Sequence, residues 1–156
     1  MSDQTQRLDR TWSLTEDRFF KEAHISPQLL SELEASARIA GERSYSPYSR
    51  FAVGAAVLTS SGKMFSGCNV ENASYGLTNC AERTAVFKAV SEGECSITAV
   101  AVYTPTSSLT PPCGACRQVL YEFGPQCFII SCGLGEGRLL SRLDLLLPGA
   151  FGPGNL

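Results

Sequence analysis

The chain has 156 residues, of which 44% are apolar and 18% charged, and its formal net charge at pH 7 is −2. This length predicts one domain with a single hydrophobic core. Because the charge is slightly negative and no run of lysine or arginine occurs, the composition argues against a protein that binds nucleic acid. No apolar run approaches the roughly 20 residues that a membrane span needs, so we expect no membrane association.

Residues 1–25 are polar and mixed in charge, without the apolar stretch of a secretory signal. We therefore expect an N-terminal extension there, disordered or lightly packed, followed by one domain over residues 26–156. The only histidine, His24, falls in this extension, and we expect it at the surface. Cysteine-rich chains without a secretory signal are typical of a reducing compartment, so the expected location is the cytoplasm.

The first predicted elements are a helix and a hairpin. Ser26 and Pro27 have the residue types of a helix start, and apolar residues recur at helical spacing to about residue 44. Two strands follow, over 51–58 and 63–70, and the turn sequence TSSG between them predicts a β-hairpin.

The second half of the chain alternates helices with buried strands. Its pattern predicts helices over 81–90 and 113–123 and mostly apolar strands over 96–104 and 126–131. A last strand and a short helix are expected before Pro148. Together these elements predict an α/β sandwich in which helices cover a mixed sheet.

The seven cysteines are an unusual feature of this composition. A disulfide framework is one interpretation, but the count is odd and a chain of this length needs no staples. Clustered cysteines in a reducing compartment more often bind metal or do chemistry. The sequence assigns no role to Cys95, Cys127 or Cys132.

Cys113 and Cys116 are three residues apart at a predicted helix start, so both sulfurs can point at one spot. A helix N-terminus carries partial positive charge, which favours the thiolate that binds metal. A redox pair or two buried thiols would show the same spacing. Cys80 stands at a second helix start, where Asn79 is the expected cap. Three thiolates from two helix starts predict a zinc site with one coordination position open, as in catalytic zinc centres.

Three charged residues next to these cysteines carry the rest of the predicted chemistry. Glu82 stands two residues after Cys80, where it can take a proton from water beside the metal without binding the metal. The same glutamate could also simply stabilise the helix dipole. Arg83 and Arg117 each directly follow a motif residue, and we expect them to donate hydrogen bonds to the sulfurs.

The stretches CAERTA at residues 80–85 and PCGACRQV at 112–119 resemble the short zinc-dependent cytidine deaminases. The likeness runs from about Leu30 to Phe151. It implies a three-layer α-β-α sandwich with a mixed five-stranded sheet. It also implies one Zn²⁺ per subunit, held by Cys80, Cys113 and Cys116. Cytidine and 2′-deoxycytidine would be deaminated to uridine and 2′-deoxyuridine by zinc-activated water, with Glu82 as the proton shuttle and release of ammonia.

The resemblance also implies how the nucleoside would bind. Asn69 and Glu71 match the family's ribose-hydroxyl partners, Phe51 would pack on the pyrimidine ring, and the backbone N–H of Ala81 would bind the base carbonyl. Phe151 matches an aromatic that reaches into a neighbouring subunit's site, and Tyr75 would lie at the same junction. The implied assembly is a homotetramer with shared active sites, which would work in cytoplasmic pyrimidine salvage.

Two alternatives stay open. A structural zinc or redox module that binds a partner would need a fourth protein ligand or a reversible disulfide. A related deaminase acting on a nucleoside antibiotic would keep the three cysteines, but such enzymes lack the Asn-x-Glu-Asn pattern present at residues 69–72. The sequence does not fix the preference between ribose and deoxyribose.

Overall fold

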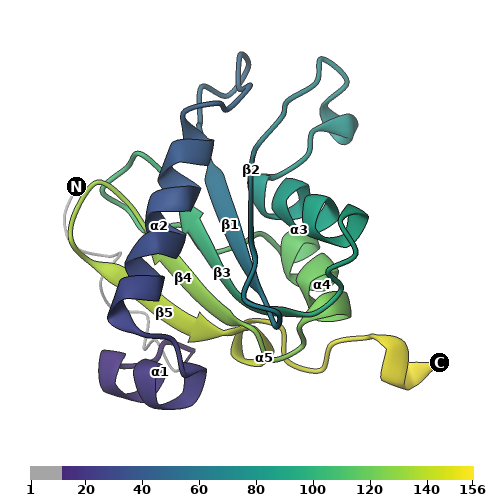
Figure 1. The fold of residues 1–156 in the computed structure, drawn as a ribbon. Helices are drawn as coiled ribbons and strands as arrows, with labels where there is room; N and C mark the ends of the chain where they lie inside the picture. Colours follow the sequence, from purple (N-terminus) through teal and green to yellow (C-terminus); the bar gives the residue numbers. More distant parts are fainter. Residues whose placement is uncertain (1–11) are drawn as a thin grey trace.

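The computed structural model describes residues 12–156, and a five-stranded sheet lies at its centre (Figure 1). The strand order is β2-β1-β3-β4-β5. β3 and β4 pair in parallel, whereas the other neighbours are antiparallel, so the sheet is mixed. The bounds are Gly54–Thr59 for β1, Met64–Cys68 for β2, Ile97–Tyr103 for β3, Phe128–Cys132 for β4 and Arg138–Arg142 for β5.

Helices cover both faces of the sheet, with α1 and α2 on one face and α3, α4 and α5 on the other (Figure 1). Because strand side chains alternate, Ala99 and Ala101 of β3 face α2, while Val100 and Val102 face α3 and α4. The predicted three-layer α/β fold class is therefore confirmed. The helix bounds are Glu16–Ala23 for α1, Pro27–Gly41 for α2, Ala81–Ser91 for α3, Gly114–Phe123 for α4 and Leu143–Leu146 for α5.

The strand directions decide where the functional residues gather. β2 and β3 each pair antiparallel with β1, so β2, β3 and β4 all run the same way and end at one edge of the sheet. The chain leaves β2 for the start of α3 and leaves β3 for the start of α4. The N-termini of α3 and α4 therefore meet at this edge, which is where ligands bind in many α/β sheets.

The N-terminal half departs from the predicted bounds around the segment that joins α2 to β1. Helix α2 ends at Gly41 rather than near residue 44, and β1 begins at Gly54 rather than residue 51. The two glycines touch, since a Cβ on Gly54 would lie 1.9 Å from Ala37 O and 2.4 Å from Gly41 N. Beyond α2 the backbone turns away, and Tyr45 N donates to Asn69 O at 3.1 Å. Three residues of the segment between α2 and β1, Ser49, Phe51 and Val53, line the pocket described below.

The described part of the predicted N-terminal extension, residues 12–25, packs onto the domain. Phe19 of α1 is fully buried, with its ring 5.4 Å from that of Phe128. Leu14 N donates to Leu140 O at 2.7 Å, which joins the segment to strand β5. Because most residues of this segment are polar, its few apolar residues did not indicate in the sequence that it packs on the domain. The expectation for residues 1–11 lies outside the described residues. Within residues 12–156, every helix is too short or too polar to cross a membrane.

Candidate active site

Three sulfur atoms converge where α3 and α4 begin. Cys80 is the N-cap of α3 and Cys113 the N-cap of α4, and neither side chain makes a capping hydrogen bond. Asn79, the expected cap, instead donates to Thr84 Oγ1 at 3.1 Å. The N-cap position leaves both thiols at the positive end of a helix dipole. Cys116, in the first turn of α4, completes the group.

The geometry of the three sulfurs fits a zinc ion. The Sγ atoms of Cys80, Cys113 and Cys116 all lie within 4.8 Å of one another, and Cys80 and Cys113 are 3.9 Å apart. Tetrahedral coordination with Zn–S bonds of about 2.3 Å places two sulfurs about 3.8 Å apart. Within residues 12–156, this is the only group of three or more Cys, His, Asp or Glu side chains close enough for a metal.

Electrostatics at this centre also favour a cation. The hydrogen bond from the Cys116 thiol, together with Arg83, lowers the pKa of Cys80 to about 5. The same contact with Cys80, along with burial, raises the pKa of Cys116. Three close sulfurs cannot all be thiolates unless a positive charge lies among them. A divalent ion would supply that charge and release the protons.

The two arginines differ in what they contact. Arg83 Nη2 donates to Cys80 Sγ at 3.4 Å, the kind of contact expected from the sequence. Arg117 departs from its prediction, because Nε donates to Pro112 O at 2.8 Å and Nη1 to Leu146 O at 3.0 Å. These are carbonyl acceptors, so Arg117 joins the loop before α4 to the end of α5. It therefore supports the position of Cys113 through the backbone of Pro112 rather than through a hydrogen bond to sulfur.

Glu82 lies in the first turn of α3 and is only 4% exposed. Burial is the main cause that raises the pKa of its carboxyl group, and the negative charge of Cys80 adds to it. The side chain lines the same pocket as Cys80 and Cys113. A buried carboxyl group beside a metal site is suited to holding and moving a proton.

A pocket of about 420 Å³ opens in front of these residues. Its walls come from the segment before β1, the end of β2, the starts of α3 and α4 and the end of β3. Most of the residues that the sequence predicts for substrate binding, and the predicted catalytic residue, line it. These are Phe51, Asn69, Glu71, Ala81 and Glu82.

Asn69 and Glu71 bind the segment that precedes β1. Asn69 is 8% exposed, its Oδ1 accepts from Ser44 Oγ at 2.5 Å and from Val53 N at 2.9 Å, and its Nδ2 donates to Phe51 O at 2.8 Å. Glu71 accepts hydrogen bonds from Tyr48 N and from both the N–H and the hydroxyl of Ser49. The hydrogen bond from the Ser49 hydroxyl is the main cause that lowers the pKa of Glu71.

Two predicted residues lie away from this pocket. Tyr75 is 74% exposed and packs on Tyr48, with the ring centroids 5.8 Å apart. Phe151 is 62% exposed on the C-terminal segment, which extends from the body of the domain beyond α5 (Figure 1). Gln118 of α4 donates to Phe151 O at 2.9 Å, so the backbone of this segment is held on α4 while its aromatic ring faces outward.

The other four cysteines do not join the centre, and all seven are free thiols. Cys127 and Cys132 are buried, and burial raises the pKa of each to about 12. Cys95 is exposed, and Cys68 donates to Arg43 O at 3.3 Å. His24 is exposed at the end of α1, as expected.

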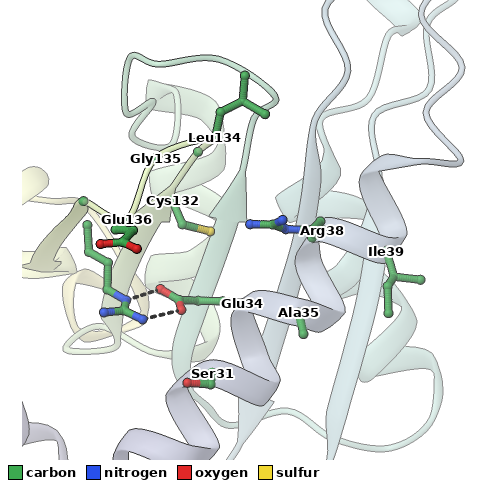
Figure 2. Close-up of a pocket in the computed structure, with 12 residues that line it drawn as sticks. Ser31, Glu34, Ala35, Arg38, Ile39, Cys132, Leu134, Gly135 and Glu136 are labelled. Atoms are coloured by element: carbon green, nitrogen blue, oxygen red, sulfur yellow. Dashed lines mark hydrogen bonds and ion pairs between the residues drawn. The ribbon is translucent and has the colours of Figure 1, made fainter.

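A larger groove of about 840 Å³ lies between α2 and the loop that joins β4 to β5 (Figure 2). Three of its charged side chains, Glu34, Arg38 and Arg138, already have partners within the protein. Arg138 donates to both carboxylate oxygens of Glu34, at 2.5 and 2.9 Å, and the Arg38 guanidinium lies 5.0 Å from the centre of the Tyr103 ring. Only the smaller pocket combines close thiols with a buried carboxyl group, so it is the candidate active site.

Some lining residues of the active-site pocket were not predicted from the sequence. Ser49, Thr78 and Thr110 belong to loops, and no spacing or motif marks them as site residues. Only the return of these loops to the edge of the sheet brings them to the pocket.

Comparisons with known proteins agree with this geometry. Residues 28–132 match the family described as "Cytidine and deoxycytidylate deaminase zinc-binding region". A cytidine deaminase from Halalkalibacterium halodurans is 53% identical over 72% of this chain and 86% of that protein. One from Sporosarcina psychrophila is 46% identical over 78% of this chain and 90% of that protein. The crystal structure of cytidine deaminase from Burkholderia pseudomallei, 47% identical, covers 78% of this chain and 98% of its own, with a TM-score of 0.75.

Proposed function

Because the chain belongs to the cytidine and deoxycytidylate deaminase zinc-binding family, we propose that it deaminates cytidine and 2′-deoxycytidine to uridine and 2′-deoxyuridine. The reaction is hydrolytic and releases ammonia. The observation that carries the proposal is the meeting of three sulfurs and the buried Glu82 carboxyl group in one pocket.

Cys80, Cys113 and Cys116 would hold the zinc ion, one per subunit. When bound, zinc supplies the Lewis acidity that lowers the pKa of water to about 7. Arg83 donates to Cys80 Sγ and so withdraws negative charge from the sulfurs. Without that contact, three thiolates would leave the centre less electropositive.

Glu82 would move the protons of the reaction. Its buried carboxyl group has a raised pKa, so it exchanges a proton nearer to neutral pH than an exposed glutamate does. We assign it removal of a proton from the attacking water and its transfer to ring N3. Glu82 would then move the remaining proton of that water to the departing amine, which leaves as ammonia. The pocket holds no other buried carboxylic acid among its lining residues, since Glu71 is partly exposed.

The pyrimidine base would lie between Phe51 and the start of α3. Phe51 is 39% exposed at the pocket wall, where its ring can cover the base. The N–H of Ala81 belongs to the first turn of α3, whose donors have no partner within the helix. That donor would bind the carbonyl oxygen of the base.

The hydrogen-bonding capacity that Asn69 and Glu71 retain suits a sugar hydroxyl. Two donors reach Oε2 of Glu71 and one reaches Oε1, so one acceptor site remains of the roughly four that a carboxylate offers. Asn69 uses one of its two amide N–H groups on Phe51 O. One acceptor and one donor match a hydroxyl group, which can both donate and accept.

We also propose the homotetramer with shared active sites that the family resemblance implies. Its support is that Tyr75 and Phe151 are exposed aromatics outside the chain's own pocket. If each ring reached into the pocket of a neighbouring subunit, it would be buried in the assembly, which would explain its exposure in the single chain. Light scattering tests the mass, and Phe151→Ala tests the role, with lowered activity expected in an intact tetramer. We further propose that the protein works in pyrimidine salvage in the cytoplasm. Its substrate would be a free nucleoside, and it would bind neither nucleic acid nor a membrane.

A structural zinc or redox module is the weaker alternative. It needs a fourth ligand or a disulfide, but within residues 12–156 the metal-competent group has three members and every cysteine is free. A deaminase of a nucleoside antibiotic would keep the zinc chemistry, but it would leave the Asn69–Glu71 pair without a sugar hydroxyl to bind.

Ultraviolet absorbance with cytidine, 2′-deoxycytidine, cytosine, CMP and blasticidin S tests the proposal. We expect loss of the cytosine chromophore with the first two compounds only, and its abolition by a chelator. Activity on blasticidin S alone would assign the antibiotic instead. A purified protein with about one zinc per chain and no activity on any compound would favour the structural module.

A further inference from the structure

The segment over residues 44–53 forms one wall of the active-site pocket and contains no helix or strand. Two side chains near the end of β2 hold it. Asn69 binds it at Ser44, Phe51 and Val53, and Glu71 binds it at Tyr48 and Ser49. The position of the wall is therefore fixed by the pair of residues that is proposed to bind the sugar.

Ser49 makes three of the hydrogen bonds in this segment, two to Glu71 and one with Phe51. Its hydroxyl donates to Oε1 of Glu71, and its N–H donates to Oε2 at 3.2 Å. The same hydroxyl oxygen accepts the N–H of Phe51 at 3.0 Å. A single oxygen atom thus connects the carboxylate proposed for the sugar to the backbone of the aromatic residue proposed for the base.

The backbone beside Ser49 shows why this connection matters. Arg50 has a φ of 56°, a left-handed conformation that is uncommon for a residue other than glycine. Such a conformation persists when surrounding contacts determine it. Here those contacts are the hydrogen bonds of Ser49 with Glu71 and Phe51 and that of Arg50 N with Ser46 O at 3.0 Å.

We propose that Ser49 is a positioning residue, which aims the free acceptor site of Glu71 at a sugar hydroxyl. The inference rests on the proposed function. Because a carboxylate with two bonds on Oε2 and one on Oε1 cannot rotate without breaking them, Ser49 determines where the last acceptor site points. Loss of the hydroxyl frees Oε1 and weakens sugar recognition, while the metal centre stays intact.

The test compares two substrates in the zinc-loaded protein. With Ser49→Ala we expect KM for 2′-deoxycytidine to rise about tenfold and kcat to change less than about threefold, because ground-state and transition-state binding fall together. For 2′,3′-dideoxycytidine, which lacks the 3′-hydroxyl, the rise in KM should be less than about threefold. Ser49→Thr keeps a hydroxyl and should restore KM to within about threefold of the wild type.

Ser46→Ala is the matched control, since Ser46 belongs to the same segment but its hydroxyl contacts Ser44 rather than Glu71. Its KM for both substrates should stay within about twofold. Equal KM changes with both substrates, or a fall in kcat alone, would overturn the role of Ser49. If Ser49→Ala does not fold, as judged by circular dichroism, Ser49→Cys takes its place with the same two substrates. A wild-type protein inactive on 2′-deoxycytidine would instead refute the proposed function.

Discussion

The chain places cysteines in two environments that differ in secondary structure and in the side chains around the sulfur. Cys80 and Cys113 stand at helix N-caps, and their sulfurs and that of Cys116 all lie within 4.8 Å of one another. Cys127 and Cys132 lie in or beside strand β4, buried among apolar side chains. Hydrogen bonds to the sulfur lower the pKa of Cys80 to about 5, whereas burial raises that of Cys127 to about 12. The position in the fold, rather than the thiol, decides whether a cysteine does chemistry.

Removing a sulfur from the helix-start group should have the largest effect. Cys116→Ser replaces a zinc ligand with a poor one, so zinc content should fall well below one per chain and activity by at least about a thousandfold. Metal analysis by mass spectrometry and the ultraviolet assay measure both. Cys95→Ser, at an exposed position outside the group, is the control and should keep full zinc and activity. Normal zinc content in Cys116→Ser would show that Cys116 is not a zinc ligand.

Glu82→Gln separates metal binding from proton transfer within the same region. The amide fills the space of the carboxyl group but cannot exchange a proton, so kcat should fall by about 10²–10⁴-fold. Zinc content should stay at about one per chain, because Glu82 lies outside the sulfur group. Loss of zinc together with activity would mean that Glu82 supports the metal centre instead.

Substitution of the cysteines in or beside β4 should lower stability and leave catalysis unchanged. Cys127 is 3% exposed within the core cluster that includes Leu120 and Leu143. Cys127→Ala leaves a small cavity and should lower the free energy of unfolding by about 1–2 kcal/mol. Urea denaturation measures this change, and kcat of the folded variant should match that of the wild type. A change in kcat with unchanged stability would show that the two regions are coupled.

Alkaline pH should reveal the raised pKa of Cys127 as a small loss of stability. In the unfolded chain a thiol ionises near pH 8.5, whereas folding holds Cys127 protonated up to about pH 12. Above pH 8.5 the folded state therefore binds more protons than the unfolded state, and stability falls as pH rises. Between pH 7 and 9 this loss should be about 0.8 kcal/mol greater in the wild type than in Cys127→Ala. Equal losses in urea titrations at the two pH values would contradict it.

The zinc ligands were within reach of sequence reasoning because their chemistry is local. Cys113 at a helix start and Cys116 three residues later have their relative sulfur positions set by backbone geometry. Cys80 shows the same helix-start signal on α3. The buried strands were equally readable, and their predicted bounds differ from those observed by at most a few residues. Helix α1 was missed because its apolar content is small, although Phe19 is fully buried.

Only the tertiary structure decided the contacts between segments that are far apart in the sequence. Arg117 follows a zinc ligand in sequence, yet the packing of α5 gives it the carbonyl oxygen of Leu146 as a partner. Ser49 and Glu71 are 22 residues apart, and their hydrogen bond exists only because β2 returns beside β1. The sequence by itself determined the Cys113–Cys116 pair, since covalent spacing and the helix dipole act over one turn. Cys80, 33 residues from Cys113, reaches the pair only because the sheet brings the starts of α3 and α4 together. The sugar side of the pocket depends on loop packing, whose energy comes from many weak contacts that no short pattern encodes.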